Sequence, residues 1–252
     1  MRLSFNFIIL FLCAFGALYY MKNILQDSLE FKEQTLGAVK SPITPYNTVF
    51  AFDIHKVLFA TDYPEKMHIF WISTPKLLVL KYLVNPFFLY KLVHCVRHCP
   101  VSEYVFNCLE AQYPGIKPLK EPYFAMCNAQ KPIPDMIQLA QKLKQQGFSL
   151  YLLSNISPTI FADLRAKFPE VFALFDGWHI PDTCNGFDHK PLPRFYIQFK
   201  RYLQERGQDN KQIIFIDDKK HNLTAAEQHG IVGIHYTPKT NVTKLLQSIG
   251  LS

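Results

Sequence analysis

The sequence lacks several features that would mark a specialised class of protein. It has no internal repeat, no low-complexity tract and no C-x-x-C pair among its six cysteines. The irregular cysteine spacing therefore favours free buried thiols in a reducing compartment over a disulfide framework. The net charge of +7 is moderate. It suggests an anionic substrate or surface, and we expect no nucleic-acid partner because duplex binders are usually more basic and more patterned.

Charge is also absent from residues 3–21, an apolar run that lies between Arg2 and Lys22. The run is just long enough to cross a bilayer as a helix. We therefore predict that residues 1–22 form an uncleaved single-pass membrane anchor. A signal peptide, followed by secretion, is the alternative, because Ala14, Gly16 and Ala17 allow a cleavage site.

After a polar linker at residues 23–47, the sequence alternates between short apolar runs and amphipathic segments. This alternation predicts an α/β fold with a Rossmann-like, doubly wound parallel sheet covered on both faces. The predicted core comprises residues 48–59 and 131–252. Strands are expected at 47–53, 148–155, 212–218 and 231–236, and helices at 133–147, 159–168, 192–207, 222–230 and 242–250.

Residues 60–130 break the alternation and predict an inserted helical domain, rich in leucine and aromatic residues. No Asp or Glu occurs between Met67 and Ser102, whereas lysines occur at 76, 81 and 91. Three interpretations of this basic, aromatic stretch remain open. It can form the core of the insertion, rest on anionic lipid, or line a site that attracts an anionic substrate.

Polar residues stand where the apolar runs of the predicted core end. Asp53 ends the first run, Ser154 and Asn155 end the second, and Asp217 and Asp218 end the third. Ligands of open parallel sheets bind at the carboxyl ends of the strands, so these side chains are candidates for one common site. Another candidate is Lys190, on the loop before the helix predicted at 192–207.

Three carboxylates that converge in one crevice repel one another unless a cation lies among them. Mg²⁺ suits such oxygen ligands and usually keeps waters and a substrate phosphate as its other ligands. A carboxylate such as Asp53 can also act as a nucleophile and form a covalent phosphoryl intermediate. The Ser154 hydroxyl and the Lys190 ammonium group would hold the phosphoryl oxygens, and phosphoryl transfer needs little beyond this positioning and charge compensation.

Four segments, FDIHKVL, LYLLSN, KPLPRFY and IFIDD, resemble in order the four motifs of the haloacid dehalogenase superfamily. The resemblance covers Thr48 to about Ser252 and implies a Mg²⁺-dependent hydrolase with a helical cap at residues 60–130. It also implies the roles of the site residues. Asp53 would attack phosphorus; Ser154, Asn155 and Lys190 would bind the substrate; and Asp53, Asp217, Asp218 and the His55 carbonyl would hold Mg²⁺, with Asp218 favoured over Asp217 as the direct ligand.

His55 departs from the pattern, because phosphatases of this family normally carry a second Asp two residues after the nucleophile. Imidazole can perform the same proton transfer, since its ordinary pKa lies near 6.5. We predict a phosphomonoester hydrolase with an aspartyl-phosphate intermediate, acting on a small phosphorylated substrate, lipid-like ones included. Dehalogenase, phosphotransferase and inactive phospho-ligand-binding relatives remain alternatives, as does a non-catalytic or purely structural His55.

Overall fold

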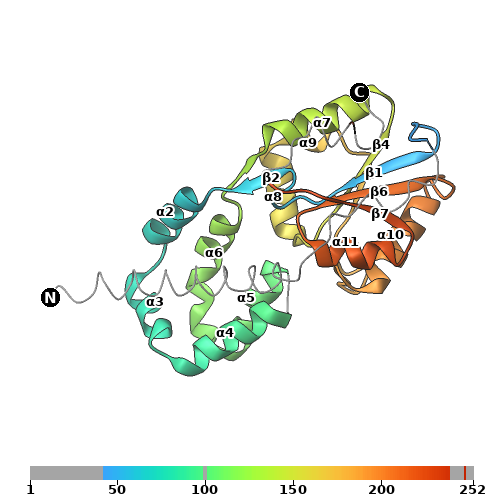
Figure 1. Cartoon of the computed structure of the whole chain (residues 1–252). Coiled ribbons are helices and arrows are strands. Elements are labelled where there is room, and N and C mark those ends of the chain that lie inside the picture. Colours follow the sequence, from blue (N-terminus) through green and yellow to red (C-terminus); the bar gives the residue numbers. More distant parts are fainter. Residues whose placement is uncertain (1–41, 99–100, 239–246, 248–252) are drawn as a thin grey trace. The chain divides into compact units, whose positions relative to one another are not determined.

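The computed structural model describes residues 42–98, 101–238 and 247, and it contains a five-stranded parallel sheet (Figure 1). The strands are hydrogen-bonded in the order β5-β4-β1-β6-β7, so the first strand of the chain lies in the middle. This arrangement confirms the predicted α/β fold with a parallel sheet. The strands are β1 (Thr48–Phe52), β4 (Ser149–Leu153), β5 (Gly177–His179), β6 (Gln212–Asp217) and β7 (Ile231–His235).

Helices cover both faces of this sheet because β1 is apolar on both sides. Its five residues are fully buried, and successive side chains point to opposite faces. Phe50 and Phe52 lie in one apolar core with helices of one face, whereas Val49 and Ala51 lie in a second core with helices of the other. The first face carries α7 (Pro134–Gln145), α8 (Pro158–Lys167) and α9 (Pro169–Phe172), and the second carries α10 (Pro193–Gln204) and α11 (Lys220–Glu227).

The chain leaves and re-enters this region through a two-stranded antiparallel ribbon, β2 (Phe59–Thr61) and β3 (Gln130–Pro132). We call residues 62–129, between the two strands, the insertion. It has its own apolar core, which includes Tyr82, Phe88 and Phe106. Its helices are α2 (Tyr63–Ser73), α3 (Lys76–Leu83), α4 (Pro86–His98), α5 (Ser102–Gln112), η1 (Pro114–Leu119) and α6 (Lys120–Cys127).

Several sequence predictions differ from the structure or fall outside it. The short elements β2, β3, β5 and α9 were not predicted, because three- or four-residue elements are too short to show a period. The anchor predicted at residues 3–21 and the helix predicted at 242–250 lie outside the described residues. Within the described part, no one helix has the length and apolar character needed to cross a membrane, although Lys76–Leu83 and Pro86–Cys95, bent by 89°, meet both criteria as a pair.

The short strand β5 ends in a buried histidine whose charge state is coupled to folding. The centroid of the His179 ring lies 4.5 Å from that of the Phe195 ring. The Nε2 atom of His179 has no hydrogen-bond partner among the described residues. Burial lowers the pKa of His179 to about 4. The unfolded chain, with an ordinary histidine pKa near 6.5, therefore takes up a proton at a pH where the folded protein does not.

We expect this histidine to make the protein less stable as the pH falls from 6.5 toward 4. When the pH is lowered from 7 to 5, the free energy of unfolding of the wild type should decrease by about 2 kcal/mol more than that of His179→Leu, which lacks this titrating group. Urea unfolding of both proteins across this range measures the difference. If the free energy of unfolding depended on pH in the same way in both proteins, His179 would not be the group responsible.

Candidate active site

Three carboxylates meet at the carboxyl ends of two neighbouring strands. Asp53 directly follows β1, Asp217 is the last residue of β6, and Asp218 comes next. One carboxylate oxygen from each of the three lies within 4.8 Å of the other two. The backbone N–H of Asp53 donates to the Ile216 carbonyl at 2.9 Å, which extends the β1–β6 pairing up to the site. The structure thus brings together the three acids that the sequence analysis places at one edge of the sheet.

Lys190 lies between two of these acids, although only 2% of its surface is exposed. Its Nζ is 2.6 Å from Asp217 Oδ2 and 3.1 Å from Asp53 Oδ1, and it donates to the Leu153 carbonyl at 2.9 Å. A buried ammonium group is stable only with such partners, because burial removes its hydration. The two carboxylates outweigh burial and raise the pKa of Lys190, so its charge is retained.

Asp217 and Asp218 differ in what surrounds them. Both oxygens of Asp217 accept hydrogen bonds from Asn222 Nδ2 at 3.0 Å, and Oδ1 also accepts from the Lys219 N–H at 2.7 Å. The Asp218 side chain is 13% exposed and has Lys56 Nζ at 3.7 Å. The carboxylate of Asp218 has fewer hydrogen-bond partners than that of Asp217, so it is better placed to bind a cation directly.

The charges of the cluster shift its pKa values in opposite directions. Burial opposes ionisation of Asp53, but the adjacent Lys190 ammonium group lowers the pKa of that carboxyl overall. Burial, assisted by the negative charges of Asp53 and Asp217, raises the pKa of Asp218 to about 6. The lysines around the cluster, Lys56, Lys190 and Lys219, thus do not bring the pKa of Asp218 back to its ordinary value. A divalent cation would supply the missing positive charge, and the three carboxylates are the hard oxygen donors that Mg²⁺ prefers.

Ser154 follows β4 and lies beside this cluster. It is completely buried, and its Oγ has no partner of good hydrogen-bond geometry in the part of the chain that the structure describes, although it lies near enough to Asp53 to lower the pKa of that carboxyl. Buried hydroxyl groups normally have a partner, so this Oγ is suited to donate to an oxygen of a bound ligand. Asn155 makes two hydrogen bonds to the backbone of Lys190: its Nδ2 donates to the Lys190 carbonyl, and its Oδ1 accepts from the Lys190 N–H, each at 2.8 Å. These bonds position the Lys190 loop, while the substrate-binding role of Asn155 stays a prediction.

His55 lies in the tight turn between β1 and β2 and contacts the other end of the insertion. Its Nδ1 is 2.8 Å from Gln130 Oε1, while Gln130 Nε2 donates to the Cys127 carbonyl at 2.9 Å. A carbonyl can only accept, so the Gln130 amide is fixed with its oxygen toward the histidine. Nδ1 therefore carries the proton in neutral His55, and Nε2 is the nitrogen that can gain or lose one. Burial lowers the pKa of His55.

Sequence reasoning did not indicate Gln130 as a residue of the site, and it assigned Asn222 no role there. Both side chains are buried, each with 2% exposure. The position of Asn222, five residues after Asp217 at the start of a helix, is a usable signal because the first turn of that helix faces the strand end. Gln130 gives no such signal, since 75 residues separate it from His55.

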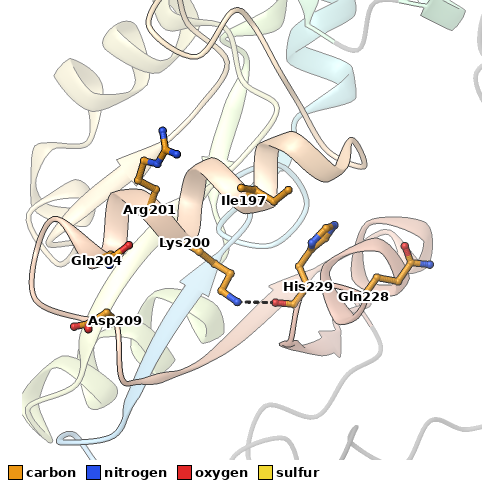
Figure 2. Close-up of a pocket in the computed structure, with 7 residues that line it drawn as sticks. All are labelled: Ile197, Lys200, Arg201, Gln204, Asp209, Gln228 and His229. Atoms are coloured by element: carbon orange, nitrogen blue, oxygen red, sulfur yellow. Dashed lines mark hydrogen bonds between the residues drawn. The ribbon is translucent and has the colours of Figure 1, made fainter.

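A concave region lies away from the acid cluster, beside α10 (Figure 2). It has a volume of about 650 Å³ and shares no residue with the acid cluster. Lys200 Nζ donates across it to the His229 carbonyl at 3.1 Å. Its lining comes from α10, the loop that follows it and the end of α11: Ile197, Lys200, Arg201, Gln204, Asp209, Gln228 and His229.

The molecule thus combines a parallel α/β sheet, an inserted helical domain, and a cluster of acids and a lysine at the strand ends, where ligands of such sheets bind. Residues 108–230 match the model of the haloacid dehalogenase-like hydrolase family. This match confirms the resemblance to that family that the four sequence motifs indicate. The matched range includes Ser154, Lys190, Asp217 and Asp218, and it begins after Asp53.

Similar proteins agree with this family. A sesquiterpene phosphatase, astK, from Aspergillus oryzae is 35% identical over 107 residues, which is 42% of this chain and 52% of that protein. The chain thus matches about half the length of that relative. A HAD family enzyme from Bacteroides thetaiotaomicron has a TM-score of 0.58 at 19% identity and covers 82% of this chain and 99% of its own. The magnesium-bound HAD hydrolase YfnB from Bacillus subtilis has a TM-score of 0.55 at 14% identity, covering 81% and 99%. At these identities the two structures establish the fold alone.

Proposed function

We propose that this protein is a Mg²⁺-dependent phosphomonoesterase that works through an aspartyl-phosphate on Asp53. The observation that carries the proposal is the cluster of Asp53, Asp217 and Asp218, with Lys190 bound between the first two. The phosphatase activity of the Aspergillus relative supports it. So does the B. thetaiotaomicron enzyme of the same fold that was crystallised with magnesium and inorganic phosphate.

The residues of the site suit two successive displacements at phosphorus. Asp53 Oδ1 accepts the Ile54 N–H at 2.7 Å and lies beside Lys190, so we assign the attack to Oδ2. A bond forms between this oxygen and phosphorus, and the ester P–O bond breaks. The leaving alcohol takes a proton from Nε2 of protonated His55. In the second step a water molecule attacks phosphorus and gives its proton to the same nitrogen. The bond between Asp53 and phosphorus breaks, which releases inorganic phosphate and free Asp53.

The remaining groups of the site would stabilise the negative charge of the phosphoryl group and keep the reacting groups in position during both steps. Ser154 Oγ and Lys190 Nζ would bind phosphoryl oxygens, which become more negative in the transition state. Asp53 and Asp218 would bind Mg²⁺ directly, with Asp217 behind them holding Lys190 in position. When bound, Mg²⁺ supplies positive charge that neutralises the phosphoryl group and the carboxylates.

The proposal is tested by measuring inorganic phosphate released from an aryl phosphate by the full chain, with Mg²⁺ or with excess chelator. We expect turnover that chelator abolishes and that Mg²⁺ restores. Farnesyl phosphate and glycerol phosphate then probe whether an apolar substrate is preferred, as the name of the Aspergillus relative suggests. Retained phosphate binding without turnover would support an inactive relative. Halide release from a 2-haloacid without metal would support a dehalogenase.

His55 and Gln130 give a separate prediction about proton transfer. We expect His55→Ala to lower kcat by about 10²–10⁴-fold, the usual contribution of a general acid or base. Gln130→Met keeps the size of the side chain but removes the acceptor for Nδ1–H, so we expect a smaller loss in kcat with little change in KM. His55→Asp should retain much of the activity. Full activity in His55→Ala would exclude the assigned role.

A further inference from the structure

Three consecutive helices of the insertion, α2, α3 and α4, carry exposed apolar side chains. Figure 1 shows the positions of these helices. Soluble proteins rarely expose large apolar side chains in such density, and contiguous apolar patches commonly mark an interaction surface. Leu77 is 84% exposed, Phe87 77% and Tyr90 73%. We call the whole set the apolar face of the insertion: Trp71, Ile72, Leu77, Leu80, Val84, Phe87 and Tyr90.

On α3 and on α4, the spacing of these residues places them on one side of each helix. Leu77, Leu80 and Val84 recur at intervals of three and four along α3 and its C-cap, and Phe87 and Tyr90 are three apart on α4. The other side of the same helices supplies Tyr82 and Phe88 to the core of the insertion. These helices are therefore apolar on two sides, and a helix of this kind is normally covered on both.

The charges within this face are all positive. No acidic residue occurs between Met67 and Ser102. Lys76 and Lys81 are exposed, and Lys91 is partly exposed. Lys76 Nζ lies 4.9 Å from the centre of the Trp71 ring, so the end of α2 and the start of α3 adjoin. Apolar side chains mixed with lysines are typical of surfaces that lie in the headgroup region of a membrane.

We propose that the apolar face of the insertion binds the surface of a bilayer that contains anionic lipids. Anionic headgroups would neutralise Lys76, Lys81 and Lys91, while Leu77 and Phe87 enter the acyl boundary. A second copy of the chain is a poorer occupant, because a two-fold symmetric contact through this face would oppose the lysines of both copies with no acid between them. The inference does not depend on the phosphatase assignment.

The test uses fluorescence, because Trp71 lies in the face and Trp178 is the other tryptophan of the chain. In the full chain carrying Trp178→Phe, Trp71 reports on the face itself, even if residues 3–21 hold the protein on a vesicle. With vesicles of phosphatidylcholine and phosphatidylserine, we expect a blue shift of Trp71 and quenching by brominated lipids. Pure phosphatidylcholine should give less of both.

Variants in the same background separate the outcomes. Leu77→Glu with Phe87→Glu should abolish the shift, whereas Ile197→Gln, a matched exposed apolar site on α10, should leave it unchanged. Lys81→Gln and Lys91→Gln should each lower the ratio of membrane-bound to unbound apolar face, as reported by Trp71 fluorescence, about fivefold. An unshifted, unquenched Trp71 on phosphatidylserine vesicles would overturn the proposal. So would a blue shift that depends on protein concentration without lipid, which would indicate self-association.

Discussion

Asp53→Asn should reduce Mg²⁺-dependent phosphate release by at least about a thousandfold, the scale of effect seen when a catalytic nucleophile is removed. An amide oxygen is a poor nucleophile toward phosphorus, so neither the covalent step nor the hydrolysis of its product can proceed. The substitution preserves size and keeps an oxygen that can accept the Ile54 N–H. A large loss of activity would therefore report on chemistry.

The measurement compares kcat/KM for an aryl phosphate in wild type, Asp53→Asn and Asp209→Asn. Asp209 is an exposed acid outside the cluster, so its variant serves as the matched control. Urea unfolding of the same samples checks that Asp53→Asn remains folded. Retention of more than about a tenth of wild-type activity by a folded Asp53→Asn would rule out Asp53 as the nucleophile.

Lys190→Met should strongly destabilise the folded protein. It removes the ammonium group that lies between Asp53 and Asp217 and leaves two buried carboxylates without compensation. Breaking a buried ion pair by removing one partner usually costs 3–5 kcal/mol, so we expect a loss of about that size in the free energy of unfolding at pH 7. Methionine preserves most of the volume, so the loss reflects charge more than packing.

Urea unfolding of Lys190→Met beside Lys200→Met measures this effect. Lys200 is exposed on α10, and its replacement should change stability by less than about 0.5 kcal/mol. Added Mg²⁺ should raise the melting temperature of Lys190→Met more than that of the wild type, because the variant has more uncompensated negative charge. A loss below about 1 kcal/mol would show that Asp53 and Asp217 do not depend on this lysine.

The two acids at the end of β6 illustrate how similar residues acquire different tasks. Asp217 is enclosed by Lys190, Lys219 and Asn222, so it holds the cluster together. Asp218 has fewer partners and a pKa raised to about 6, mainly by burial. The difference supports the expectation that Asp218 is the direct metal ligand, and it assigns Asp217 to the positioning of Lys190.

The sequence by itself was sufficient to predict the parallel sheet and the approach of Asp53, Asp217 and Asp218. Strands buried on both faces are continuous apolar runs, and parallel strands end at the same edge, so residues that follow such runs must be near one another. The structure also brings Lys190 to this edge. Short elements such as β5 escaped prediction because three residues carry no readable period.

Only the tertiary structure decided which residues complete the site and which faces remain exposed. Gln130 meets His55 across 75 residues, and no local pattern encodes that distance. The basic, aromatic stretch of the insertion allowed three interpretations in sequence, because helices apolar on two sides have no preferred face. Packing placed Tyr82 and Phe88 inside and left Leu77 and Phe87 outside, since the geometry of neighbouring helices, and not hydropathy, determines which side is covered.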